Sequence, residues 1–252
     1  MFYPSNAIEL ASAVRSYISD GPPVATDAPA KAFVLPHAGY DYSGPIAGTG
    51  YRVMENERAV VRRIILLGPS HRLAFRGLAL PEANTFATPL GEVAVDETAI
   101  NQALDLPGVQ ILEEAHVREH SLEVHLPFLQ TALNQFTLVP LVVGEANEAE
   151  VSTVLEALWG GAETRIVISS DLSHYYDHNT AQQLDRQTAE DILNLRPVQT
   201  SQACGANALN GLLHSARAHS LRPRMLDLRN SGDTAGDRSR VVGYGAFTFE
   251  RR

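Results

Sequence analysis

The sequence predicts an α/β fold: one layered domain over residues 1–252, with a central, mostly parallel or mixed sheet flanked by helices. Short apolar segments of strand length alternate along the chain with longer segments of helical periodicity. The 252 residues are enough for one large core, and no linker, repeat or low-complexity tract divides them. The composition, with 44% hydrophobic and 19% charged residues, is typical of a globular protein.

In the first half of the chain, apolar runs bounded by turn residues predict strands, and helical periodicity next to capping residues predicts helices. Ser5 and Asp96 are the expected N-caps, and Pro45 is expected at a first helical position, where its missing N–H costs nothing. The Gly-Pro-Pro after Asp20 ends the first helix. The predicted elements are a helix at 5–17, a strand at 32–35, a helix at 45–55, a strand at 64–67, minor strands at 78–80 and 93–95, and a helix at 97–105.

The second half continues the alternation. Asn147 and Glu150 have the spacing of a capping box, and Gly160-Gly161 ends the helix that they begin. Pro127 is expected to interrupt or bend a helix over residues 119–133. The predicted elements are helices at 119–133, 147–159, 180–195 and 204–216, and strands at 137–143, 165–169, 225–229 and 241–249.

Charge and composition exclude several classes of protein. The formal charge of −9 argues against nucleic-acid binding, and the longest apolar runs are too short to span a membrane. The only lysine, Lys31, stands between two alanines, so there is no Walker A phosphate site. One cysteine permits no internal disulfide, and the first residues do not have the pattern of a secretory signal. We therefore expect a cytoplasmic protein.

Three histidines follow three predicted strands at the end where each strand stops. His37 comes two residues after one strand, His71 four after the next, and His174 five after the strand at 165–169. The carboxyl ends of parallel strands meet at one edge of a sheet, and α/β proteins bind ligands at that edge. The spacing therefore predicts that these histidines share a site.

Cys204 and Asp171 are further candidates for this site. Cys204 stands where a helix is expected to begin, and a helix N-terminus favours the thiolate, the form that binds metal. Histidines with one cysteine can hold zinc, copper or iron(II). Asp171 precedes His174 by three residues and could orient a histidine or a water. The alternatives are a buried structural cysteine, hydrogen-bonded loop histidines and an aspartate that caps a turn.

The segment EHSLEVH at residues 119–125 is dense in polar groups but does not have the HExxH order of a zinc protease. In the helix expected here, residues five positions apart point about 140° away from each other. His120 and His125 are therefore not expected in the same site, and His120 is the better candidate to reach the pocket.

Eight motifs together resemble the Memo-like family, whose prokaryotic members are called AmmeMemoRadiSam system protein B. They run in order from Phe2 to Phe247: FYPSN, LPHAGYDYSG, LLGPSH, TPLGEV, EHSLEVHLPFL, SSDLSHY, ACGANALNGLL and YGAF. The resemblance implies the fold of the LigB-type class III extradiol dioxygenases, which cleave catechols with non-heme iron(II). Members usually carry a few residues before the FYP segment, so the start at Met1 is expected to be truncated.

The resemblance also implies roles for individual residues. His37, His71 and Cys204 match the metal positions of the family, with cysteine standing where the dioxygenases have glutamate. His174 matches the position of a catalytic base, and Asp171 another pocket position. Tyr40, Tyr42 and His120 are expected to line the substrate pocket. The metal is expected to be iron(II) or copper, with zinc as a third choice.

Three hypotheses about function stay open. The first is a dioxygenase-like oxidoreductase acting on a small aromatic or diol-like substrate. The second is a copper- or iron-binding redox or metal-handling protein without an organic substrate. The third is a non-catalytic module that binds a peptide or protein. The family name further implies partners of the AMMECR type and a radical SAM enzyme, and neither nucleic acid nor a membrane is expected as a partner.

Overall fold

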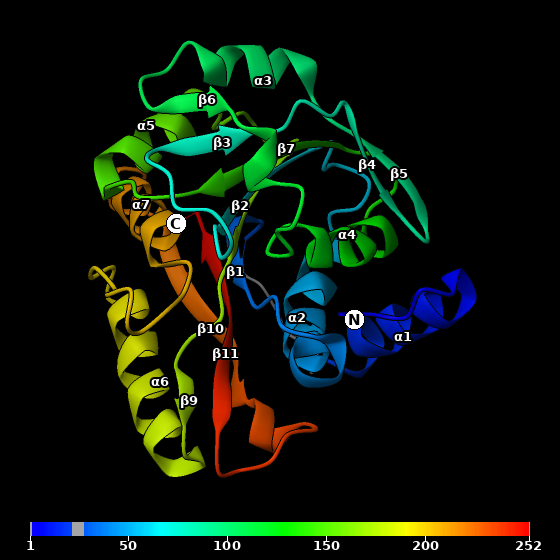
Figure 1. Cartoon of the computed structure of the whole chain (residues 1–252), viewed down its shortest axis with the longest axis vertical. Helices are drawn as coiled ribbons and strands as arrows, with labels where there is room; N and C mark the ends of the chain where they lie inside the picture. Colours follow the sequence, from blue (N-terminus) through cyan, green and yellow to red (C-terminus); the bar gives the residue numbers. More distant parts are fainter. Residues whose placement is uncertain (1, 22–27, 252) are drawn as a thin grey trace.

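A nine-stranded mixed sheet runs through the computed structural model, which describes residues 2–21 and 28–251 (Figure 1). The strand order is β10-β11-β1-β8-β2-β7-β3-β6, and β9 pairs with the first residues of β11. Its strands are β1 (Ala30–Leu35), β2 (Arg63–Pro69), β3 (Leu78–Leu80), β6 (Val109–Ile111), β7 (Thr137–Val143), β8 (Thr164–Ser169), β9 (His174–Tyr176), β10 (Arg222–Asn230) and β11 (Val241–Glu250).

The centre of the sheet is parallel. Ile65 of β2 is paired with Ile166 of β8 on one side and with Val139 of β7 on the other, and β1 continues the parallel set beyond β8. β11 and β3 flank this centre in antiparallel orientation. The central strands are buried along nearly their whole length, which agrees with helices covering both faces. The predicted α/β fold with a mostly parallel, mixed sheet is confirmed.

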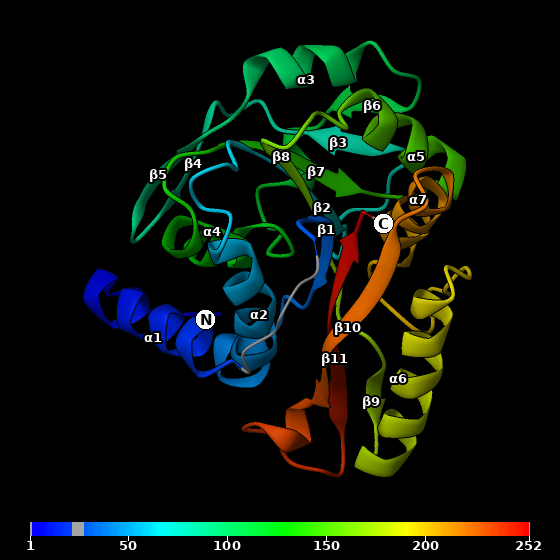
Figure 2. The same cartoon turned by 180° about the vertical axis from the view of Figure 1, so that it is seen from behind.

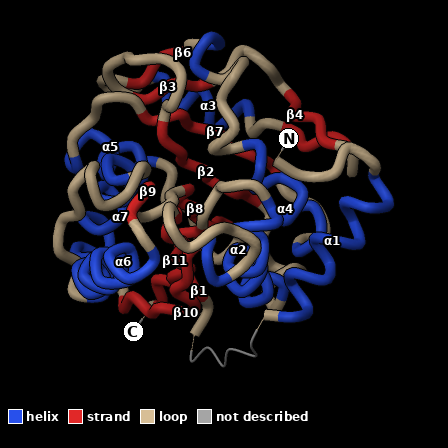
Figure 3. The backbone as a smooth tube through the Cα atoms, turned by 60° about the horizontal axis from the view of Figure 1, so that its bottom comes forward, coloured by secondary structure: helices blue, strands red, loops and turns tan. Residues whose placement is uncertain are grey.

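Helices lie on both faces of the sheet (Figures 2 and 3). α1, α2 and α4 contribute to the apolar core on one face, and α3, α5, α6 and α7 contribute to the core on the other. No helix in the described residues has the length and apolar character needed to cross a membrane. The helices are α1 (Ala7–Asp20), α2 (Tyr40–Glu55), α3 (Glu97–Leu104), α4 (Leu126–Ala132), α5 (Glu148–Ala157), α6 (His178–Leu193) and α7 (Ala206–Ala218).

Two of the three predicted caps are confirmed. Asp96 caps α3 through its side chain, and Asn147 with Glu150 forms the capping box of α5. Ser5 is not the cap of α1, because the side chain of Asn6 accepts the first free amides of that helix. The helix then continues to Asp20, and the two prolines predicted to end it lie outside the described residues.

The start of α2 differs from the prediction. The helix begins at Tyr40 rather than at Pro45, because the carbonyl of Gly39 already accepts from the amides of Tyr42 and Ser43. Pro45 therefore lies inside the helix instead of at its first position. As a result, the residues right after His37 belong to a helix and not to an open loop.

The predicted helix over residues 119–133 forms only in its second half. Residues 119–120 have no regular structure, residues 121–122 form a turn, a 3₁₀ turn spans Glu123–His125, and α4 begins at Leu126. Pro127 is the second residue of α4, so it starts the helix rather than bending it. The carboxylate of Glu119 accepts from the backbone amides of the next two residues, which competes with helical hydrogen bonding.

Other differences concern short elements. The minor strand expected at 93–95 is present as β5 (Gly91–Ala94), which pairs with β4 (Thr85–Thr88) in a separate hairpin, while Val95 forms a single bridge to Leu138 of β7. The sequence did not predict β6 or β9, each of which is only three residues long. Cys204 does not begin a helix either, since α7 starts at Ala206 with Gly205 as its N-cap.

Candidate metal centre

The carboxyl ends of three parallel strands carry the centre of the site. His37 follows β1, His71 follows β2, and β8 leads through Ser169 to Asp171. The strands β1, β8 and β2 are adjacent in that order, so their ends lie next to one another. The imidazoles of His37 and His71 come together there, with ring centroids 5.2 Å apart.

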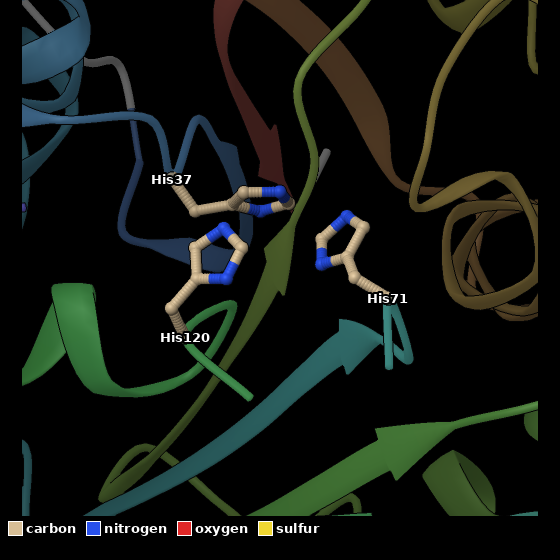
Figure 4. Close-up of side chains that lie close together, drawn as sticks. All are labelled: His37, His71 and His120. Carbon is tan, nitrogen blue, oxygen red and sulfur yellow. The ribbon is translucent and has the colours of Figure 1, made fainter. Parts of the chain in front are cut away.

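His120 completes a group of three imidazoles that point toward one another from three segments (Figure 4). One ring nitrogen from each of His37, His71 and His120 lies within 4.8 Å of the others. The His120 ring stacks on His71 at 4.9 Å and meets His37 edge-on at 5.6 Å. Phe2 stacks on the other side of His120, with centroids 4.1 Å apart, so the N-terminal segment covers this part of the site.

Glu119 holds two of the three histidines. Its carboxylate accepts from the backbone amide of His71 at 2.6 Å and lies 2.9 Å from the Nδ1 of the same residue. It also accepts from the amides of His120 and Ser121. Burial opposes its ionisation, but these hydrogen bonds, above all those from His71, lower the pKa of Glu119 to about 2. Because a carboxylate only accepts, His71 carries its proton on Nδ1 and leaves Nε2 free for a metal.

His37 is 2% exposed, and burial lowers its pKa well below the ordinary value, so the ring is neutral. Its backbone amide donates to Asp171 Oδ1 at 2.8 Å, and its Nδ1 lies 2.6 Å from Ser169 Oγ. Both contacts come from the end of β8. They fix the backbone and the ring of His37 independently.

Cys204 lies at the same edge, with its Sγ 3.4 Å from His37 Nε2. The amide of Asp171 donates to this sulfur at 3.2 Å. The thiolate expected from a helix N-terminus is not favoured in the metal-free protein: burial, followed by the charge of Asp171, raises the pKa of Cys204 to about 12. A metal would have to displace the thiol proton to bind the sulfur.

His174 is not one of the three imidazoles that come together, although it is near enough to influence the pKa values of His37 and Asp171, and Asp171 contacts His37 directly. His174 is the first residue of β9, and its Nδ1 lies 2.8 Å from the carbonyl oxygen of Leu172, so that nitrogen donates and Nε2 is the basic one. Asp171 is buried, which raises the pKa of its carboxyl group, and its Oδ2 lies 4.0 Å from His37 Nε2.

The two tyrosines expected at the pocket have different surroundings: one is buried in the core and the other is exposed. Tyr40 is 4% exposed and donates its hydroxyl to the carbonyl of Val124, so it belongs to the core and does not line a mouth. Its position at the start of α2 turns it inward. Tyr42 is 43% exposed on the surface side of the same helix. A pocket of about 490 Å³ opens instead beside Cys204, with apolar residues Leu73, Phe75 and Val143 among its lining.

Sequence reasoning missed three contributors: Glu119, Ser169 and His125. A helix over this segment predicts that His125 points away from His120. In the 3₁₀ turn that actually forms, its Nε2 reaches Ser169 Oγ at 2.9 Å. The signal that could have identified Glu119 is its place directly before His120, in a segment unusually rich in charged and polar residues.

The donor set fits a bound metal ion. Three imidazoles with a sulfur nearby match the ligands of iron, copper and zinc. His120 Nδ1 is buried and has no hydrogen-bond partner within residues 2–21 and 28–251; it lies 3.4 Å from Glu119 Oε1 without hydrogen-bond geometry. A buried nitrogen without a partner is costly unless something else binds it.

Comparisons with known proteins give the family and the fold of the chain. A "MEMO1 family protein" of Sulfurisphaera tokodaii is 34% identical over 233 residues, covering 86% of this chain and 82% of the relative. One of Archaeoglobus fulgidus is 34% identical over 264 residues, covering 98% and 96%. The crystal structure of protein JW3007 from Escherichia coli K12 shares the fold, with a TM-score of 0.54 at 15% identity over 85% of this chain and 98% of that one. The sequence model of the Memo-like protein family matches residues 1–248, and with these relatives it shows that the chain belongs to the Memo-like family.

Proposed function

We propose that the protein is a metal-dependent oxidoreductase with a single redox-active ion at the edge of its sheet. The observation that carries this proposal is the group of three ring nitrogens from His37, His71 and His120 within 4.8 Å of one another. His37 and His71 would hold the ion. The remaining protein ligand would come from Cys204, as the resemblance implies, and His120 is a further candidate because of its unpartnered nitrogen.

Iron(II) is the metal that we propose first. Imidazole ligands suit iron, and a site with open positions on a ferrous ion supplies the one-electron chemistry that activation of O2 requires. The substrate class that we propose is a small aromatic or diol-like molecule. Its apolar part would occupy the pocket beside Cys204, which Leu73, Phe75 and Val143 line.

The surrounding side chains would then handle protons. His174 Nε2 would take a proton from a substrate hydroxyl, because its Nδ1–H is already donated to the carbonyl of Leu172. Asp171 would hold the backbone of His37 in place through the amide hydrogen bond. Burial of Asp171 and His37 keeps bulk water from this side of the site.

Elemental analysis tests the proposal. The protein is purified without a His tag under anaerobic conditions, reconstituted with iron(II), and compared with His71→Ala, His120→Ala and Cys204→Ala. We expect about one equivalent of iron in the wild type and almost none in His71→Ala. Whichever of the other two variants loses the metal identifies the remaining ligand. His219→Ala, which alters a surface histidine paired with Glu156, is the control.

Oxygen consumption with catechols then tests the reaction. Iron-loaded protein is expected to consume O2 when a catechol is added, and His174→Ala is expected to lose most of this rate while retaining iron. A wild-type protein that takes up no metal would contradict the proposal and would favour a pocket used only to bind a peptide or protein.

A second candidate is a copper-binding redox protein without an organic substrate. The position of Cys204 Sγ, 3.4 Å from His37 Nε2, favours it, because a thiolate beside imidazole is a soft donor set that suits Cu(I). Competition with a chromogenic Cu(I) chelator would distinguish the two. Tight Cu(I) binding that Cys204→Ala abolishes, together with no O2 consumption in any metal form, would support this second function.

A further inference from the structure

We infer that Ser169, His125 and Tyr51 form a buried hydrogen-bond chain that sets which ring nitrogen of His37 carries the proton. This hydrogen-bond chain leaves the Nε2 lone pair of His37 directed at the group of three imidazoles. This inference rests on the proposed metal-binding function, and it assigns positioning roles to three residues that do not themselves belong to the group of three imidazoles.

Ser169 is the centre of this hydrogen-bond chain. Its Oγ lies 2.5 Å from the carbonyl oxygen of Ser121, 2.6 Å from His37 Nδ1 and 2.9 Å from His125 Nε2. A carbonyl oxygen cannot donate, so the serine hydroxyl proton must lie between Ser169 and Ser121. A serine hydroxyl has one proton to donate and two lone pairs that accept. Both imidazoles must therefore donate to Ser169.

These hydrogen bonds fix the tautomers of both imidazole rings. His37 carries its proton on Nδ1, and as a neutral ring it has an unprotonated Nε2. His125 carries its proton on Nε2, so its Nδ1 must accept, and Tyr51 donates to it from a hydroxyl 2.8 Å away. Every donor and acceptor in the chain then has one consistent partner. The reverse tautomer at either ring would place two protons or two lone pairs against each other.

Burial makes the arrangement hard to change. Tyr51, His125 and Ser169 are each no more than 1% exposed, and His37 is 2% exposed. A group in this chain that lost its partner would be left unpaired in the interior. Tyr51 comes from the middle of α2, His125 from the turn before α4, and Ser169 from the end of β8. Three elements of the fold thus contribute to a hydrogen-bond chain that reaches the ring of His37 through Ser169.

The opposite side of His37 agrees with this assignment. Cys204 Sγ lies 3.4 Å from Nε2, so its thiol can donate either to an unprotonated Nε2 or to the carbonyl oxygen of Asp171, 3.7 Å away. This contact is compatible with the unprotonated Nε2 that the hydrogen bonds of Ser169 require. A metal ion that approaches the three imidazoles would meet a nitrogen already in the form that binds metal.

Nitrogen-15 NMR of histidine-labelled, metal-free protein tests the inference. We expect His37 as the Nδ1–H tautomer and His125 as the Nε2–H tautomer. Ser169→Ala removes the shared acceptor, so we expect His37 to populate both tautomers and iron(II) or Cu(I) to bind about 10–100-fold more weakly. Tyr51→Phe should shift the Nδ1 signal of His125, which loses its hydrogen bond, while the ring keeps its proton on Nε2.

Matched variants separate these effects from a general loss of packing. Ser152→Ala removes a buried serine hydroxyl that is bonded to Ser215 elsewhere in the protein, and Tyr40→Phe removes a buried tyrosine hydroxyl that is bonded to a backbone carbonyl. Neither is expected to change the His37 signals or the metal affinity. Urea unfolding of each variant shows whether it folds.

Three results would overturn the inference. The first is His37 as the Nε2–H tautomer in the wild type, and the second is a Ser169→Ala variant with wild-type tautomers and affinity. The third is an equal loss of affinity in the control variants. If the wild type binds no metal at all, the proposed function fails, but the NMR spectrum still decides the protonation of His37. If Ser169→Ala does not fold, the wild-type spectrum decides it alone.

Discussion

Glu119 and Ser169 perform the same task for different histidines. Each offers acceptors to an Nδ1–H, Glu119 to His71 and Ser169 to His37, so that the opposite nitrogen of each ring is free. The two differ in charge. The carboxylate of Glu119 adds a negative charge next to the histidine group, whereas the hydroxyl of Ser169 is neutral. A cation at this site would therefore be stabilised more by the charge of Glu119 than by the neutral hydroxyl of Ser169.

We expect Glu119→Gln to weaken iron(II) binding about 10–100-fold, the range found for outer-shell partners of metal-bound histidines. Glutamine carries no charge. Its side-chain NH2 group would also face either His71 Nδ1–H or a backbone N–H, and two donors that face each other cannot form a hydrogen bond. Isothermal titration of anaerobic protein measures the affinity. Glu156→Gln is the matched control, because Glu156 also pairs with a histidine, His219, but on the surface. Equal affinities in all three proteins would contradict this role.

At the scale of elements, the site depends on how closely residues 119–122 pack against the end of β2. A Cβ atom on Gly68 would lie 2.6 Å from Ser121 Oγ and 2.9 Å from a methyl carbon of Leu122. Ser121 also donates its hydroxyl to the carbonyl of Pro69. The absence of a side chain at Gly68 thus allows the segment with Glu119 and His120 to reach the histidine that follows β2.

Gly68→Ala is expected to lower the free energy of unfolding by about 1–3 kcal/mol, because an extra methyl group would be forced into a packed contact. It is also expected to weaken metal binding, since the segment must move away from β2. Urea unfolding and metal titration measure the two effects. Gly39→Ala is the control: its Cβ would meet neighbours at an ordinary 3.7 Å. A Gly68→Ala protein that is destabilised but binds metal normally would show that the close contact serves only stability.

The sequence allowed the parallel strands of the sheet and the residues at their ends to be predicted, because apolar runs bounded by turn residues are local signals. The same reasoning failed where a side chain bonds to its own backbone. Residues 119–133 have a helical pattern of apolar residues, but Glu119 accepts from the two amides that follow it and keeps the segment out of the helix. The positions of His120 and His125 depend on this turn, so neither could be derived from spacing.

At the scale of the whole molecule, binding at the site should stabilise the entire fold. The residues of the histidine group come from segments up to 83 positions apart, since His37 and His120 belong to it. An ion that binds only the folded chain adds stability by mass action, about 2.7 kcal/mol at a concentration 100 times the dissociation constant. We expect the melting temperature to rise with iron(II) and to fall again with a chelator. His71→Ala should show neither change. A wild-type melting temperature that does not change when iron(II) is added would argue against binding to the folded state.

The pH dependence of stability is a second property of the whole molecule, and Asp185 of α6 should influence it. Asp185 is 2% exposed and accepts from the amide of Ser173, while its Oδ2 has no partner among the residues that the structure describes. Burial raises its pKa from 3.8 to about 6. The folded state therefore favours the protonated acid, and stability is lost as the pH rises from about 4 through about 6.

Asparagine at this position keeps the shape and the acceptor oxygen but cannot ionise. We expect Asp185→Asn to be more stable than the wild type by about 3 kcal/mol at pH 8 and by only about 0.5 kcal/mol at pH 4, where the acid is protonated in the folded state and roughly half ionised in the unfolded state. Urea unfolding at both pH values measures this, with Asp105→Asn on the surface as the control. If the two proteins differ by the same amount at pH 4 and pH 8, the carboxyl group of Asp185 does not titrate as its burial requires. A difference confined to high pH would show that the fold buries a carboxyl group without a cationic partner against Gly243 of β11, next to Ser173, the residue before His174.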